Sequence, residues 1–349
     1  MAKKSKNALA IFLESIGLYF SNFDKFVKYM TFPVLGQLVG LILIFLCSYL
    51  FSTNMPVIID KNPSLNNFNT LVLIAILISV PGLIILMKAF WEYLVAYGAI
   101  NSMLENMLKS GKVYDFDAHT ELIKRRSLSF VGLWLLIGIF SIFAMCPLLW
   151  VPAGVVAVFL VLIFQVFTYE PELSPFGCVI KSMSLIKGHF ASTFMLIALV
   201  GALTYFLIPQ IVNTLFNVLG ITKFLSNLIV PFVSQFPISE INAILIKFYL
   251  KPLEIEFITV SIISTTIMTV LVQYTLPMRT LLWGMWYREL NGGLTDLGIK
   301  KKSSRSATTK SHKRPSEKLM EESHKKFATK KIDKNILKRA MEKDDEENS

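Results

Sequence analysis

The sequence predicts an all-α fold: a polytopic transmembrane helical bundle of about six spans, with amphipathic interfacial helices and a disordered basic C-terminal tail. The 349 residues are 54% hydrophobic and only 17% charged, which is too apolar for a soluble domain of ordinary composition. The apolar residues form long unbroken runs, whereas a β-barrel would show short alternating segments. We therefore expect a transmembrane helical domain over 1–290 and a flexible basic cytoplasmic tail over 291–349.

Six apolar segments are long enough to cross a bilayer, whose core of about 30 Å needs roughly 20 apolar residues in a helix. Their predicted bounds are Pro33–Phe51, Thr70–Lys88, Phe130–Trp150, Val151–Phe167, Phe190–Val212 and Phe257–Leu276. Pro147 and Pro152 separate the third and fourth spans, which predicts a tight hairpin. Residues 213–256 hold two short apolar pieces, which predict a re-entrant hairpin, interfacial helices or two further spans.

Basic residues are concentrated in alternate connections. The N-terminal 29 residues and the second connection each carry five Lys or Arg, and the chain after the sixth span carries eighteen, whereas the first connection carries one and the third none. Cytoplasmic loops are enriched in Lys and Arg. We therefore expect a multi-pass protein of the cell membrane, specifically a bacterial inner membrane, with both termini in the cytoplasm.

Two similar segments lead into spans, and we call them elbows. In the first, 9–30, apolar residues recur with the spacing of one helix face, and the second, 176–190, behaves similarly. An offset of 167 residues aligns Ser15 with Ser182 and Phe23 with Phe190, which suggests an internal repeat, although so loose a pattern also arises by chance. We expect the elbows to lie in the interface, where basic residues contact lipid headgroups: Lys25, Lys28, Lys181, Lys187, Arg279 and Arg288.

The second elbow also resembles the recurring entry motif of a broad group of bacterial six-span membrane proteins of unknown function. This group is similar to the membrane domain attached to some glycerophosphodiester phosphodiesterases. The matching residues are Ser182, Leu185, Lys187, Gly188 and Phe190, of which Gly188 is expected to let the chain turn. The resemblance implies a six-span fold over roughly residues 9–290. It carries over no catalytic residue, because nothing in the chain resembles the soluble phosphodiesterase domain.

Ionisable residues at membrane depth are costly and are therefore functional candidates. Lys88 and Glu92 stand four residues apart on one long predicted helix. One interpretation is that Lys88 reaches the cytoplasmic interface beside an aromatic belt. The other is that the two residues form an intramembrane pair, which a transporter would need.

A second intramembrane candidate is the hydroxyl stripe of the sixth span. Ser261, Thr265 and Thr269 recur every four residues. Hydroxyl groups at this spacing indicate either helix packing or a polar pathway. Gln37 and Gln165, in other spans, are candidates to face the same interior.

No catalytic constellation is evident. The best candidate is YDFDAHTE, where Asp115, Asp117, His119 and Glu121 alternate. On an extended strand these four would share one face and could bind a divalent metal. A solvated loop that balances the basic residues following it is the preferred interpretation. We expect no enzyme activity, no catalytic site, no metal and no cofactor.

Two functions therefore stay open. The first is a protein that organises membrane lipid or partner proteins, with the basic tail binding anionic headgroups. The tail lacks aromatic residues between its basic ones, apart from Phe327, which disfavours nucleic acid or the ribosome as a partner. The alternative is a transporter or channel for a small solute.

Overall fold

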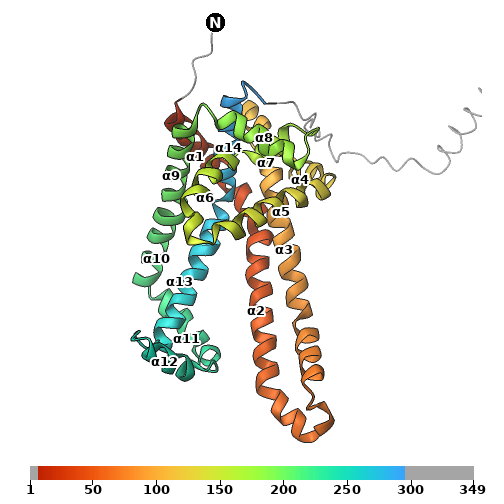
Figure 1. The fold of residues 1–349 in the computed structure, drawn as a ribbon, viewed down its shortest axis with the longest axis vertical. Helices are drawn as coiled ribbons and strands as arrows, with labels where there is room; N and C mark the ends of the chain where they lie inside the picture. The colour runs from red at the N-terminus through yellow and green to blue at the C-terminus, as the bar shows by residue number, and fades with distance from the viewer. Residues whose placement is uncertain (1–6, 295–349) are drawn as a thin grey trace, which may run out of the picture. The chain divides into compact units, whose positions relative to one another are not determined.

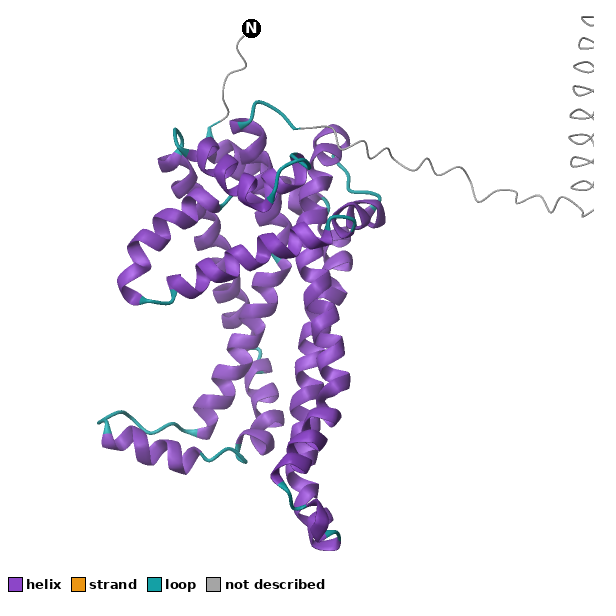
Figure 2. Cartoon of the chain, turned by 45° about the vertical axis from the view of Figure 1, so that its right-hand side comes forward, coloured by secondary structure: helices purple, strands orange, loops and turns teal. Residues whose placement is uncertain are grey.

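The computed structural model describes residues 7–294, which lie in one compact helical unit. The predicted basic tail lies outside the described residues from residue 295 onward. Over 7–294 the chain forms helices and no strand, so the predicted all-α class is confirmed for this part of the chain (Figure 2).

Within residues 7–294, six helical segments are long and apolar enough to cross a membrane, as the sequence predicts. They are Phe23–Lys61 (α2), Phe68–Ser110 (α3), Ser127–Ala144 (α5), Pro147–Tyr169, Phe190–Val218 and Ile255–Leu290. The last three spans are each made of shorter helices. The fourth consists of Pro147–Leu149 (η2), Trp150–Leu160 (α6) and Ile163–Tyr169 (α7), and the fifth consists of Phe190–Gly201 (α9), Ala202–Leu207 (η3, a π-helix) and Ile208–Val218 (α10). The sixth consists of Ile255–Tyr274 (α13) and Leu276–Leu290 (α14).

Helices α2 and α3 form a long antiparallel pair (Figure 1), joined by Pro63–Leu65 (η1). Their seam is lined by small residues. A Cβ atom built on Gly40 would lie 2.7 Å from the backbone nitrogen of Leu86, and one on Gly82 would lie 2.9 Å from that of Ile44. The absence of side chains at these glycines lets the two backbones approach closely, which is how helices associate within lipid.

Short helices precede three of the spans at one end of the unit, which we call the elbow end (Figure 1). They are Ala8–Ser21 (α1) before α2, Phe116–Lys124 (α4) before α5 and Pro175–Ile186 (α8) before α9. The residue before each span leaves helical geometry in the same way, with φ and ψ of −126° and 21° at Asn22, −108° and 25° at Arg126, and −131° and 21° at His189. The α4 elbow is one that the sequence patterns missed.

The turn of the second elbow does not depend on a special glycine conformation. Gly188 is absent from the residues with positive φ, and a Cβ atom built on it would meet nothing within 4 Å. Gly188 does lie in the turn that follows α8, but its backbone angles do not require glycine. His189, the next residue, precedes α9 with angles open to any residue.

The segment between the fifth and sixth spans folds into Ile221–Val233 (α11) and Ile238–Lys247 (α12), bent by 94°. Helices of 13 and 10 residues are about 20 and 15 Å long, shorter than the bilayer core. Two further full spans are therefore excluded, and the sharp bend between α11 and α12 fits one broken span or the predicted re-entrant hairpin. It lies at the end of the unit opposite the elbows (Figure 1).

The third and fourth spans form the predicted tight hairpin, which turns through η2. In Figures 1 and 2 this hairpin runs across the α2–α3 pair at a steep angle instead of alongside it. Large apolar side chains near its tip are exposed: Ile142, Phe143, Met145, Leu148, Trp150 and Val151.

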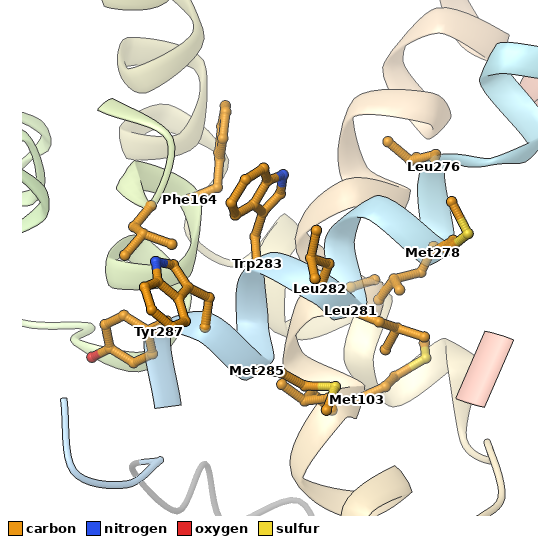
Figure 3. Close-up of a cluster of buried hydrophobic side chains, with 14 of the residues drawn as sticks. Met103, Phe164, Leu276, Met278, Leu281, Leu282, Trp283, Met285 and Tyr287 are labelled. Carbon is orange, nitrogen blue, oxygen red and sulfur yellow. The ribbon is translucent and has the colours of Figure 1, made fainter. Parts of the chain in front are cut away.

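The buried core lies at the elbow end, where α3, α7 and α14 meet (Figure 3). Met103 of α3, Phe164 of α7 and Trp283 of α14 belong to it. A Cβ atom on Gly284 would lie 2.6 Å from the Cδ2 of Leu104, so a larger residue here would require that leucine side chain to shift. The lower parts of the long helices expose apolar side chains, as expected for surfaces covered by lipid.

Candidate functional site at the α13–α14 break

The sixth span breaks between α13 and α14, and the sequence explains the position of the break. Pro277 has no N–H group, so the carbonyl of Gln273, four residues earlier, lacks its usual helical donor. The helix is interrupted at Thr275 and resumes at Leu276. Arg279 lies in the first turn after the break, next to these backbone groups.

The guanidinium of Arg279 bridges the break to the fifth span. Nη1 donates to the hydroxyl of Tyr205 at 2.5 Å, and Nη2 donates to the carbonyl oxygen of Val272 at 3.0 Å. The guanidinium carbon also lies 5.3 Å from the centroid of the Tyr205 ring. The buried Nε atom has no hydrogen-bond partner.

Tyr205 lies on the π-helical turn η3, which also has a local cause. Pro209 follows Tyr205 by four residues and is buried, so it removes the donor for the Tyr205 carbonyl and crowds that oxygen. The helix widens over Ala202–Leu207. Such π-turns occur frequently at functional sites. Prolines thus loosen the fifth and sixth spans at the two places that Arg279 joins.

The surroundings of Arg279 are aromatic and hydroxylic. Tyr93 and Tyr97 of α3 lie near enough to Arg279 to interact with it electrostatically. Within residues 7–294 no carboxylate forms an ion pair with Arg279. The site is therefore a cation surrounded by tyrosines, and it is open at Tyr205, which is 48% exposed.

Three of the six basic residues predicted to contact headgroups are engaged with the protein. Lys25 donates to the carbonyl of Val113 at 3.2 Å, Lys181 lies 3.5 Å from the Glu170 carboxylate, and Arg279 has the contacts given above. Lys28 and Lys187 are exposed, and Arg288 is half-buried.

Lys88 and Glu92 do not pair with each other in the described structure. Glu92 Oε1 lies 2.8 Å from Lys124 Nζ, because α4 packs on α3 and brings Lys124 to it. The exposed Lys88 side chain places Nζ 5.6 Å from the centroid of the Phe32 ring. The hypothesis of an intramembrane Lys88–Glu92 pair is therefore wrong for this structure.

The hydroxyl stripe does not line an interior. Thr265 and Thr269 are exposed and Ser261 is half-buried. Thr269 donates to the carbonyl of Thr265, in its own helix, at 2.8 Å. Gln273 does face another span, with Nε2 at 3.4 Å from Gln37 Oε1.

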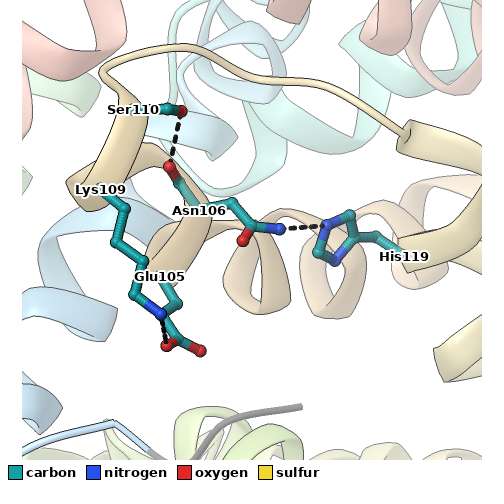
Figure 4. A network of polar contacts seen from close by, with 5 residues as sticks. All are labelled: Glu105, Asn106, Lys109, Ser110 and His119. Atoms are coloured by element: carbon teal, nitrogen blue, oxygen red, sulfur yellow. Dashed lines mark hydrogen bonds and ion pairs between the residues drawn. The ribbon is translucent and has the colours of Figure 1, made fainter. Parts of the chain in front are cut away.

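The YDFDAHTE segment is largely helical, since α4 begins at Phe116, so the alternative of an extended metal-binding strand is wrong. No group of three potential ligands among His, Cys, Asp and Glu occurs within 7–294. His119 is buried, with Nδ1 2.7 Å from Ser102 Oγ and Nε2 3.3 Å from Asn106 Nδ2 (Figure 4). Burial lowers the pKa of His119 to about 4, so the imidazole is neutral and docks α4 onto α3.

Sequence reasoning also missed a buried polar network in the core. Asn101 Nδ2 donates to the Phe164 carbonyl at 3.1 Å and to Thr168 Oγ1 at 2.9 Å. Tyr169 donates to the Asn101 carbonyl at 2.6 Å. The signal was a lone asparagine within the apolar run 95–104. These hydrogen bonds tie α3 to α7, and the Asn101 Oδ1 atom is buried beside them without a hydrogen-bond partner.

No known relative identifies the role of this site, so its role is inferred from its geometry. The resemblance of the second elbow to the six-span group stays a prediction. No family model matches the chain, and neither a curated protein nor a solved structure matches it.

Proposed function

We propose that this multi-pass membrane protein has no enzymatic role and organises lipid in the leaflet at its elbow end, the cytoplasmic leaflet of the cell membrane. Organisation of partner proteins is the competing role. The single observation that carries the proposal is the close match between the α1 and α8 elbows.

The two elbow helices correspond at the offset of 167 residues in capping and in burial. Their N-caps are Asn7 and Ser174, each accepting a hydrogen bond from the first turn. Their inner faces are buried at matched positions: Ile11 with Cys178, Ser15 with Ser182, and Tyr19 with Ile186. The same backbone angles follow at Asn22 and His189.

The outer faces of these helices are apolar and also correspond. Leu9 matches Phe176 and Leu13 matches Ile180, and all four are exposed. Two exposed lysines lie close in sequence to the residues that precede these spans: Lys28 follows Asn22, and Lys187 precedes His189. Apolar side chains beside basic groups are the pattern with which interfacial helices enter the boundary between acyl chains and anionic headgroups.

The features expected of a transporter do not support that alternative in the described structure. Glu92 is paired with Lys124 near the surface, and the hydroxyls of Thr265 and Thr269 face outward. We therefore favour a role in lipid organisation.

The test is the lipid composition around the full-length protein extracted in native-lipid discs. We expect enrichment of anionic phospholipid over the bulk membrane. The double variant Leu13→Asn, Ile180→Asn should lose this enrichment, since polar side chains weaken both outer faces. Phe68→Asn, at an exposed position far from the elbows, is the matched control and should keep it. A wild-type lipid profile equal to the bulk, or a stoichiometric protein partner that displaces the lipid, would overturn the proposal.

A further inference from the structure

We propose that Arg279 and Tyr205 form a binding site for a phosphate group, presented either by a phospholipid headgroup or by a soluble phosphate compound. The site lies between the π-turn of the fifth span and the break of the sixth. It goes beyond the proposed role of the elbows, because neither residue belongs to their outer faces.

The positive charge of Arg279 is not neutralised by a carboxylate within residues 7–294. A guanidinium stays protonated in proteins, and the partners that the described residues offer Arg279 are neutral: the Tyr205 hydroxyl and the Val272 carbonyl, with the Tyr93 hydroxyl close by. The Nε–H group is buried without an acceptor. An unpaired cation in a segment that crosses the membrane is costly and marks a functional site by default. An anion from outside the chain would supply the missing countercharge.

Arg279 and Tyr205 together have hydrogen-bond donors that a phosphate group could use. Tyr205 accepts a hydrogen bond from Arg279, so its own O–H is free to donate. The second N–H groups of Nη1 and Nη2, together with this O–H, are therefore the donors available to one ligand beside the exposed Tyr205. Arginine binds phosphate through two parallel hydrogen bonds, and a tyrosine hydroxyl adds a third donor.

The backbone holds Arg279 and Tyr205 in place. Pro209 and Pro277 fix the π-turn and the helix break, and Arg279 Nη2 is anchored on the Val272 carbonyl. This anchor alone would be a structural role, satisfying a carbonyl at a broken helix. A lysine could also donate to that carbonyl, but it lacks the fork that grips a phosphate. Arg279→Lys therefore separates the two roles.

The experiment uses the full chain in discs of zwitterionic lipid. In one arm the disc is doped with phosphatidylglycerol, and native mass spectrometry counts bound lipid. In the second arm inorganic phosphate is added, and ³¹P NMR line broadening reports binding. Diacylglycerol, which lacks the phosphate, is the negative ligand. Binding in the first arm alone identifies a lipid headgroup, and binding in the second identifies a soluble phosphate source.

We expect Arg279→Gln to weaken binding about tenfold or more, the effect of losing a charge-assisted hydrogen bond. Tyr205→Phe and Arg279→Lys should weaken it by a smaller factor. Arg125→Gln, at an exposed arginine paired with Glu121, is the matched control and should bind as the wild type does. Circular dichroism checks the fold, and if Arg279→Gln does not fold, the two milder variants decide.

Three results would overturn the site: no phosphate-dependent binding in either arm, unchanged binding in Tyr205→Phe and Arg279→Lys, or an equal loss in Arg125→Gln. The elbow variant Leu13→Asn, Ile180→Asn should retain binding at this site. Failure of the elbow proposal and failure of the phosphate site are therefore distinguishable.

Discussion

The imidazole Nδ1 of His119 lies 2.7 Å from the hydroxyl oxygen of Ser102, which in turn donates to the Ala99 carbonyl at 2.7 Å. The amide nitrogen of Asn106 can only donate, so Nε2 accepts from it and Nδ1 carries the proton. The neutral ring thus satisfies both of its nitrogens. A protonated ring would bring two donors together at Nε2.

This arrangement predicts that acid weakens the docking of α4. The folded pKa of about 4 lies below the ordinary value of 6.5, so the undocked state binds a proton first. The stability is fully present above pH 6.5 and falls as the pH drops toward 4, by at most about 1.4 kcal/mol per pH unit. Hydrogen exchange of α4 at pH 7 and pH 5 measures this loss. His119→Gln, which cannot titrate, should flatten the dependence, and an equal slope in both proteins would contradict it.

The glycine seam predicts that Gly40→Ala destabilises the α2–α3 pair. The added methyl group would lie 2.7 Å from backbone nitrogen and 2.9 Å from the Gly82 carbonyl oxygen, and neither can move aside as a side chain can. Overpacking of this kind costs about 1–3 kcal/mol. Gly138→Ala is the control, since nothing lies within 4 Å of its Cβ position, and it should be neutral or slightly stabilising. Thermal unfolding in detergent compares them, and equal midpoints would refute the prediction.

Asn22 and His189, which precede α2 and α9 at equivalent positions, are predicted to lose different amounts of folding free energy on substitution. Asn22 donates to the Gly111 carbonyl at 3.1 Å and accepts from the Val113 N–H at 3.0 Å, whereas the equivalent His189 is exposed. Asn22→Ala leaves the buried Val113 N–H without its partner, at about 1–3 kcal/mol. His189→Ala should cost much less. Denaturant unfolding of both variants provides the measurement, and similar losses would show that the hydrogen bonds of Asn22 contribute little.

The ion pair between Glu92 and Lys124 is predicted to be weak. The side chains are 26% and 40% exposed, and exposed pairs of this kind contribute about 1 kcal/mol or less. A double-mutant cycle with Glu92→Gln and Lys124→Gln should give a coupling in that range. A coupling of several kcal/mol would instead place the pair in a medium of low dielectric and revive the idea of an intramembrane charge network.

The spans were predictable because their signal is local composition. The elbow helices α1 and α8 were also visible, since each has an apolar periodicity and precedes an apolar run. The α4 elbow was missed because its sequence is rich in charge, and its fixed position comes from His119 packing on another helix. Tertiary packing also decided the partner of Glu92, which no spacing along one helix could show.

The Arg279 site shows the same division. The predicted fifth span ran through Pro209 without a break, and Arg279 was predicted only as a headgroup contact at the interface. Its contact with Tyr205, however, joins residues 74 positions apart. The contact also depends on a π-turn, which shifts the side chains that follow it around the helix axis. Sequence periodicity assumes an unbroken α-helix and therefore cannot locate such a contact.

Helix α3 gives the molecule a mechanical property. From Gly82, in the glycine seam, to Ser110, beyond the His119 pocket, it contains no proline. This segment is about 43 Å long. A tilt of about 5° at the seam would displace the far end by roughly 4 Å. If a change in bilayer thickness altered the tilt of α2 and α3, the proline-free part of α3 would carry that tilt to its far end. The surface on which α4 docks would then move.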